Sequence, residues 1–191
     1  MKVSKKIYPS FFVAIALSVL ILPIRWVICW ITAACVHEIF HWLALKILKI
    51  PIRGVCIKWN GAVIRTERIS GIPLAICAIL GPIGSLLLAV FVNIAPRLAL
   101  CGLFQATYNL LPIVSLDGGN VICGILTPIF GEIKAEKIVL YISTFVISMI
   151  AMITFYTAVR YKLGLMPLIM LAILLVKYKN LPCKDRTLRV Q

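Results

Sequence analysis

The chain contains only two histidines, His37 and His41, and Glu38 lies between them. Residues four apart on an α-helix share one face, so both imidazoles can bind the same metal ion. A glutamate beside such a pair can take a proton from the water that attacks a substrate. The sequence therefore predicts a zinc site with His37 and His41 as ligands and Glu38 as the general base.

The setting of these residues strengthens the prediction. Of the 191 residues, 62% are hydrophobic and only 14% are charged, with a mean hydropathy of +1.07. This composition excludes an ordinary soluble domain. Ionisable side chains inside a membrane helix cost a few kcal/mol, about 2.5–3.5 for an aspartate at its centre, unless they have partners, so they usually mark a functional site. A polar contact between two helices is the alternative.

Catalytic zinc needs a third protein ligand and one open position. Among the acidic residues other than Glu38, only Asp117 has a largely apolar neighbourhood; the others are Glu67, Glu132, Glu136 and Asp185. Pro112 and the pair Gly118 and Gly119 should interrupt the apolar run around it. Unwound backbone at membrane depth is tolerated inside protein or beside a wet cavity, so Asp117 could reach the metal. Helix capping is its alternative role.

Asn109 lies in the same segment as Asp117. Its amide could hydrogen-bond a substrate carbonyl or a metal ligand, and a helix contact is the alternative.

The lengths of the apolar segments, and the proline, glycine and basic residues that separate them, predict an all-α polytopic membrane protein. We expect one domain over 1–191, with a metal-site core at about 26–130. The expected transmembrane helices are about six, at 8–24, 26–48, 71–96, 98–112 with an extension to about 130, 135–159 and 164–179. A break at Pro23 is needed because one helix over 8–48 would be about 60 Å long.

A short β-hairpin is expected between the second and third spans. Two β-prone runs from Val55 to Arg65 flank Asn60 and Gly61, a pair that suits a type I′ turn. A plain loop is the alternative.

The charge distribution predicts an orientation. The net charge of +14 comes from basic residues that flank apolar spans, and most of the 20 fall on one side if the N-terminus is cytoplasmic. The positive-inside rule then places both termini in the cytoplasm. No nucleic-acid partner is expected. The seven cysteines lack CxxC spacing, which favours buried thiols over a cysteine metal site.

Two motifs in order carry a resemblance. The segment from His37 to His41, with the segment Asn109–Gly119 that reads Asn-x-x-Pro-x-x-x-Leu-Asp-Gly-Gly, resembles the site-2 protease family of intramembrane zinc metalloproteases, peptidase family M50. The resemblance implies that His37, His41 and Asp117 bind zinc and that Glu38 activates water. The segment from Gly81 to Ser85 is similar to the family's Gly-Pro-x-x-Asn motif, with serine in place of asparagine. It implies a substrate-binding position for Ser85.

The resemblance also implies an activity and partners. We expect hydrolysis of a peptide bond in a membrane-associated protein, within or near the lipid bilayer of a bacterial cell membrane, with inhibitory or regulatory membrane proteins as further partners. The hairpin and six-span plan resemble the subgroup that includes the sporulation protease acting on a pro-sigma factor. Asn109 and the hairpin edge are candidates for orienting an extended substrate.

Two other classes of function are open on the residues alone. A transmembrane metal transporter would also carry intramembrane histidine and aspartate, although as several sites along a route. A non-catalytic metal-binding membrane protein would not need Glu38.

Overall fold

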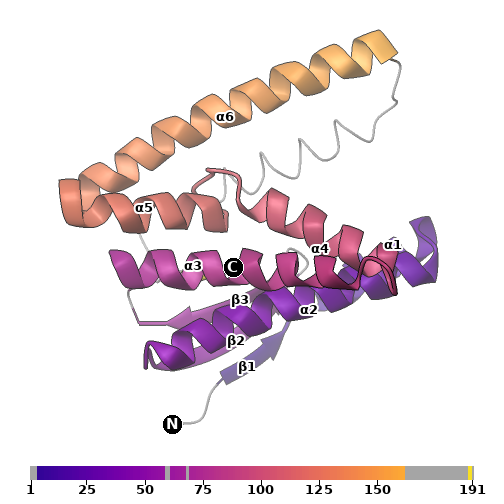
Figure 1. Cartoon of the computed structure of the whole chain (residues 1–191), viewed down its shortest axis with the longest axis horizontal. Helices are drawn as coiled ribbons and strands as arrows, with labels where there is room; N and C mark the ends of the chain where they lie inside the picture. Colours follow the sequence, from indigo (N-terminus) through magenta and orange to yellow (C-terminus); the bar gives the residue numbers. More distant parts are fainter. Residues whose placement is uncertain (1–3, 59–60, 68, 162–188, 191) are drawn as a thin grey trace.

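The computed structural model describes residues 4–58, 61–67, 69–161 and 189–190, and most of them are helical (Figure 1). The helices are α1 (Pro9–Ile21), α2 (Ile24–Ile47), α3 (Ile72–Leu87), the 3₁₀ turn η1 (Leu88–Phe91), α4 (Pro96–Asn109), α5 (Asp117–Phe130) and α6 (Glu132–Tyr161). The strands are β1 (Ser4–Ile7), β2 (Ile52–Lys58), β3 (Gly61–Thr66) and β4 (Arg189–Val190).

Three helical segments of the described chain are long and apolar enough to cross a bilayer: Ile24–Ile47, Ile72–Phe91 and Glu132–Ala158. Helices α1, α4 and α5 have 13 or 14 residues, fewer than the roughly 20 that a perpendicular span needs. The span predicted at 164–179 lies outside the described residues. The membrane class is therefore supported, and the number of six spans stays a prediction.

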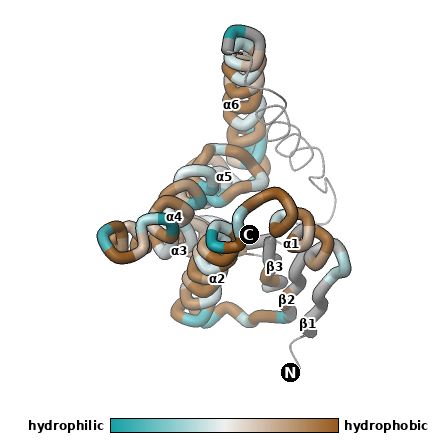
Figure 2. Tube along the Cα trace, turned by 90° about the vertical axis from the view of Figure 1, so that its right-hand side faces the viewer, coloured by the Kyte–Doolittle hydropathy of each residue, from teal (hydrophilic) through white to brown (hydrophobic). Residues whose placement is uncertain are grey.

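Many hydrophobic residues of the helices are exposed, and Figure 2 shows that hydrophobic residues recur along α6. Along this helix Phe145, Met152 and Phe155 are 67%, 73% and 67% exposed. Apolar patches of this extent are rare on soluble monomers. Lipid chains are the environment that such a surface fits.

The two predicted helix breaks are present. Helix α1 ends at Ile21 and α2 begins at Ile24, with Pro23 as the N-cap residue. The predicted fourth span is two helices, α4 and α5, separated by residues 110–116 around Pro112. Gly118 and Gly119 lie inside α5 and do not interrupt it. The break therefore ends immediately before Asp117.

The predicted hairpin is confirmed and belongs to a larger sheet. Strands β2 and β3 are antiparallel, with Val55 opposite Ile64 and Lys58 opposite Gly61. Strand β1 pairs with β2 in parallel and β4 pairs with β3, giving the order β1-β2-β3-β4. The two outer strands were not predicted, since both are short and lie in the basic ends of the sequence. Asn60 of the expected turn lies outside the described residues.

Helix α3 is the centre of the helical layer and contacts α2, α4 and α5 (Figure 1). Small residues allow the close approach: a Cβ at Gly84 would overlap Phe40 of α2, and one at Gly124 would overlap the backbone of α3. Glycine contacts of this kind are typical of membrane helix packing.

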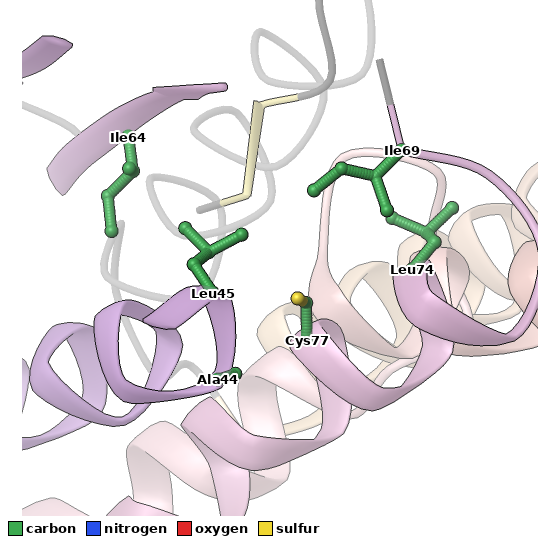
Figure 3. Packing of buried hydrophobic residues seen from close by; sticks show 6 residues of the cluster. All are labelled: Ala44, Leu45, Ile64, Ile69, Leu74 and Cys77. Atoms are coloured by element: carbon green, nitrogen blue, oxygen red, sulfur yellow. The ribbon is translucent and has the colours of Figure 1, made fainter. Parts of the chain in front are cut away.

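One buried cluster ties the helices to the sheet (Figure 3). Its residues come from the end of α2, from β3, from the segment between β3 and α3, and from the first half of α3: Ala44, Leu45, Ile64, Ile69, Leu74 and Cys77. The sheet is thereby attached to the end of α2 that follows the two histidines.

Candidate metal centre

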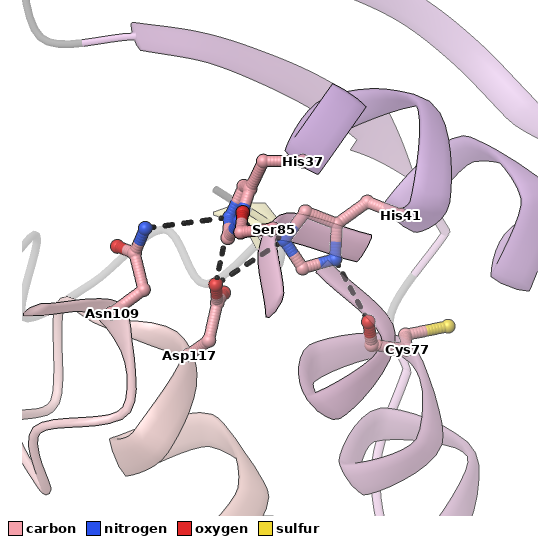
Figure 4. Close-up of polar contacts among 6 residues, drawn as sticks. All are labelled: His37, His41, Cys77, Ser85, Asn109 and Asp117. Carbon is pink, nitrogen blue, oxygen red and sulfur yellow. Dashed lines mark hydrogen bonds and ion pairs between the residues drawn. The ribbon is translucent and has the colours of Figure 1, made fainter. Parts of the chain in front are cut away.

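His37 and His41 of α2 face Asp117, the first residue of α5 (Figure 4). The Asp117 Oδ2 atom lies 3.0 Å from His37 Nε2 and 3.3 Å from His41 Nε2, and the two Nε2 atoms are 3.1 Å apart. All three side chains are at most 2% exposed. Asp117 is 76 positions after His41 in the sequence, yet it and the two histidines present three ligand atoms to one buried point.

The spacing of these atoms fits a metal ion. Two ligands about 2.05 Å from a tetrahedral zinc ion lie about 3.3 Å from each other. The three distances of 3.0, 3.1 and 3.3 Å are close to that value. Small movements of the side chains would accommodate an ion, with the fourth position left for water or substrate.

The hydrogen bond of His41 indicates that a cation belongs at this point. Its Nδ1 atom lies 2.8 Å from the backbone carbonyl oxygen of Cys77. A carbonyl only accepts hydrogen bonds, so Nδ1 carries the proton and a neutral ring has a bare Nε2. That lone pair faces the carboxylate oxygen of Asp117, and the two repel each other unless a proton or a metal ion lies between them.

Asp117 retains an unused ligand atom. Its Oδ1 is buried and has no hydrogen-bond partner within the described part of the chain. A buried polar atom without a partner usually has a functional explanation. Leu116 is the N-cap of α5, and the Asp117 carboxylate is directed at the histidines. These contacts favour metal binding over capping as its role.

The loop before Asp117 is held by Ser143 of α6, which the sequence reasoning missed. The Val114 amide donates to Ser143 Oγ at 2.9 Å, and this hydroxyl lies 2.6 Å from the Val139 carbonyl and 3.2 Å from that of Pro112. Ser143 is fully buried. The available signal was weak, because Thr144 and Ser148 are further hydroxyl residues in the same part of the helix.

The glycine pair after Asp117 has a packing role. A Cβ at Gly118 would overlap the Leu110 carbonyl, and one at Gly119 would overlap the Ile113 carbonyl. Side chains at these two positions would push the loop away from the start of α5, and Asp117 would move with it.

The other predicted site residues lie around the triad. Glu38 is half-buried on α2 and follows His37 directly in the sequence. The Asn109 Nδ2 atom is 3.5 Å from His37 Nε2, at the limit of hydrogen-bond length. The Ser85 hydroxyl lies 3.0 Å from His37 Nδ1 and is fully buried. The structure thus brings all six predicted site residues to one region.

The remaining acids have other settings. Glu67 is exposed and pairs with Arg53 at 2.7 Å. Glu132 and Glu136 lie in the first turns of α6, and Asp185 falls outside the described residues. Over the described ranges, the triad of His37, His41 and Asp117 is the one histidine, cysteine and carboxylate group with metal-binding spacing.

Gly81 of α3 makes the room that the His41 ring occupies. A Cβ at this position would overlap the ring at Nε2, Cε1 and Cδ2. Overpacking a buried site costs about 1–3 kcal/mol, so we expect Gly81→Ala to weaken metal binding by about 5- to 150-fold. Competition with a chelator of known affinity measures this change.

Leu87→Ala is the matched control, since Leu87 lies on the same helix and is 50% exposed. Its metal affinity should equal that of the native protein. An unchanged affinity in Gly81→Ala would show that His41 does not bind the metal in the position described.

Comparisons with known proteins give one family match and one structural match, and the family match does not include His37, Glu38 or His41. The model of peptidase family M50 matches residues 64–153, which include Ser85, Asn109 and Asp117. The chain is similar to the solved structure of the site-2 protease from Methanocaldococcus jannaschii, with a TM-score of 0.65 and 20% identity over 94% of this chain and 90% of that one. At this identity the likeness concerns the fold. No curated protein matches the chain.

Proposed function

We propose that this chain, whose residues 64–153 match the model of peptidase family M50, is an intramembrane zinc endopeptidase that cleaves a membrane-associated protein substrate. The observation that carries the proposal is the convergence of His37, His41 and Asp117 at tetrahedral ligand spacing inside a hydrophobic helical layer. His37, His41 and Asp117 would hold the ion, and Glu38 is adjacent on the same helix as both histidines.

The bound metal would supply a Lewis acid that polarises the scissile carbonyl and makes water more acidic. Glu38 is the proposed general base: it accepts a proton from the attacking water and returns it to the leaving amine. Asn109, which lies beside His37, can donate a hydrogen bond to the substrate carbonyl. Glu38 is adjacent to His37 on α2, and the Asn109 Nδ2 atom lies 3.5 Å from His37 Nε2.

Access of the peptide bond requires local unwinding, because a helix encloses its own backbone. The sheet next to α2 offers a backbone edge to an unwound segment. Strand β4 pairs with Ile64 and Arg65 of β3. A substrate strand would therefore pair beside these two residues or replace β4.

The finer membrane assignment is also proposed. We propose six spans, both termini in the cytoplasm and a bacterial cell membrane. Three apolar helices support the spans, and the basic flanks support the orientation. We propose a single integral domain over 1–191, with the metal-site core at about 26–130, and inhibitory or regulatory membrane proteins as partners. A role in sporulation would follow from the resemblance of the hairpin and the six-span plan to the sporulation subgroup.

Removal and return of the metal tests the function. Purified protein is reconstituted with total membrane proteins from cells that lack it, and new peptide termini are identified by mass spectrometry. We expect cleavage in the native sample, loss of all of it after treatment with a zinc chelator, and recovery when zinc is added back.

Two outcomes would count against the proposal. The same termini in the chelated sample would show that cleavage needs no metal. Zinc flux into the proteoliposomes without any new termini would favour a transporter.

A further inference from the structure

One face of α3 contacts both histidine rings on the side away from Asp117. Cys77, Gly81 and Ser85 are spaced four residues apart, so they lie on the same face of this helix. The Cys77 carbonyl contacts His41, Gly81 leaves room for its ring, and Ser85 contacts His37 (Figure 4). Each imidazole thus has its Nδ1 atom on α3 and its Nε2 atom toward Asp117.

The two Nδ1 contacts differ in kind. His41 is held by a backbone carbonyl, at 2.8 Å, which no side-chain substitution at Cys77 removes. His37 is held by a side-chain hydroxyl, at 3.0 Å. A hydroxyl can accept or donate, so this contact by itself leaves the position of the ring proton open.

Metal binding at Nε2 determines the direction of the second contact. A neutral imidazole that gives its Nε2 lone pair to a metal carries its proton on Nδ1. The His37 Nδ1 proton then has the Ser85 oxygen as its acceptor. Ser85 and His37 are 0% and 2% exposed, so bulk water cannot replace this acceptor.

We propose that Ser85 is a positioning residue whose hydroxyl accepts a hydrogen bond from His37 Nδ1 and so holds Nε2 of that ring toward the metal. This inference rests on the proposed function of the site as a metal centre. It assigns Ser85 a contact with a metal ligand, although the motif resemblance placed it with the substrate. The full burial of Ser85 beneath the ring supports the positioning role.

The first test is the metal affinity of Ser85→Ala. Contacts that orient a metal-bound histidine are worth about 10- to 100-fold in affinity, so the zinc dissociation constant should rise by that factor. Ser85→Thr keeps the hydroxyl and should retain most of the affinity. Thr32→Ala removes an exposed hydroxyl from α2, bonded to the Ile28 carbonyl, and should leave the affinity unchanged.

The second test uses the fact that the chain has two histidines. Protein labelled with ¹⁵N-histidine and loaded with zinc should give two Nδ1–H signals, each protected from exchange with water. Ser85→Ala should move or broaden the signal of His37 alone, since the Cys77 carbonyl still holds His41. A purely structural role for Ser85 would disturb both signals or neither.

The outcomes separate this inference from the proposed function. A native zinc affinity in Ser85→Ala, or rapid solvent exchange of the His37 Nδ1 proton in the native protein, would overturn the role of Ser85 and leave the peptidase intact. The second measurement needs no variant, so it holds even if Ser85→Ala fails to fold. Failure of the native protein to bind zinc would overturn both proposals.

Discussion

Glu38→Gln is expected to keep the bound metal and to lower the rate of peptide hydrolysis by about 10²- to 10⁴-fold, the range that general base catalysis supplies. Glutamine has nearly the shape of glutamate but cannot take a proton from water. The triad that would hold the metal does not include Glu38, so zinc content should be unaffected. Zinc per protein and the cleavage rate, measured on the same sample, check both parts.

Glu67→Gln is the control for the loss of one negative charge. Glu67 is exposed and paired with Arg53, and exposed ion pairs contribute only about 0–1 kcal/mol, so folding and cleavage should persist. Cleavage by Glu38→Gln at the native rate would remove Glu38 as the base. Loss of zinc from this variant would instead place Glu38 among the groups that hold the metal.

The triad was predictable because its members are ionisable side chains in apolar segments. Two histidines and an aspartate in a chain that is 62% hydrophobic leave few alternatives. The spacing of His37 and His41 placed both on one helix face, which the structure confirms. The break at Pro112 was also readable, because proline removes a backbone donor and restricts the residue before it.

The groups that orient the triad were much harder to predict. The contact of His41 with Cys77 uses a backbone oxygen, so the residue type carries no signal. Ser143 contacts the loop before Asp117, but it belongs to α6, which begins at Glu132, 15 residues after Asp117. Such contacts depend on how α3 and α6 pack, and helix periodicity does not determine packing partners.

The same reason explains the sheet. The turn signal at Asn60 and Gly61 predicts a local hairpin, and β2 and β3 form it. The pairing of β1 with β2 joins segments about 50 residues apart, and β1 has only four residues. A strand of this length carries no pattern of its own, so its partner could not be inferred.

Among the three proposed metal ligands, the sequence supported Asp117 least directly, and its replacement has the other large expected effect. We expect Asp117→Ala to lose zinc and all measurable peptide hydrolysis. Removal of a direct ligand should weaken binding by more than the about 10- to 100-fold that loss of an outer contact costs. Zinc retained after dialysis, and cleavage of membrane proteins by the reconstituted variant, are the measurements.

Glu132→Ala provides a matched control, because Asp117 and Glu132 are each the first residue of a helix. Acidic groups at helix starts contribute about 0.3–1 kcal/mol through the helix dipole, and both variants lose this stabilisation. Only Asp117→Ala should also lose the metal. If it kept one zinc ion at native affinity, the third ligand would be another residue, and the burial of Asp117 between two imidazoles would need a different explanation.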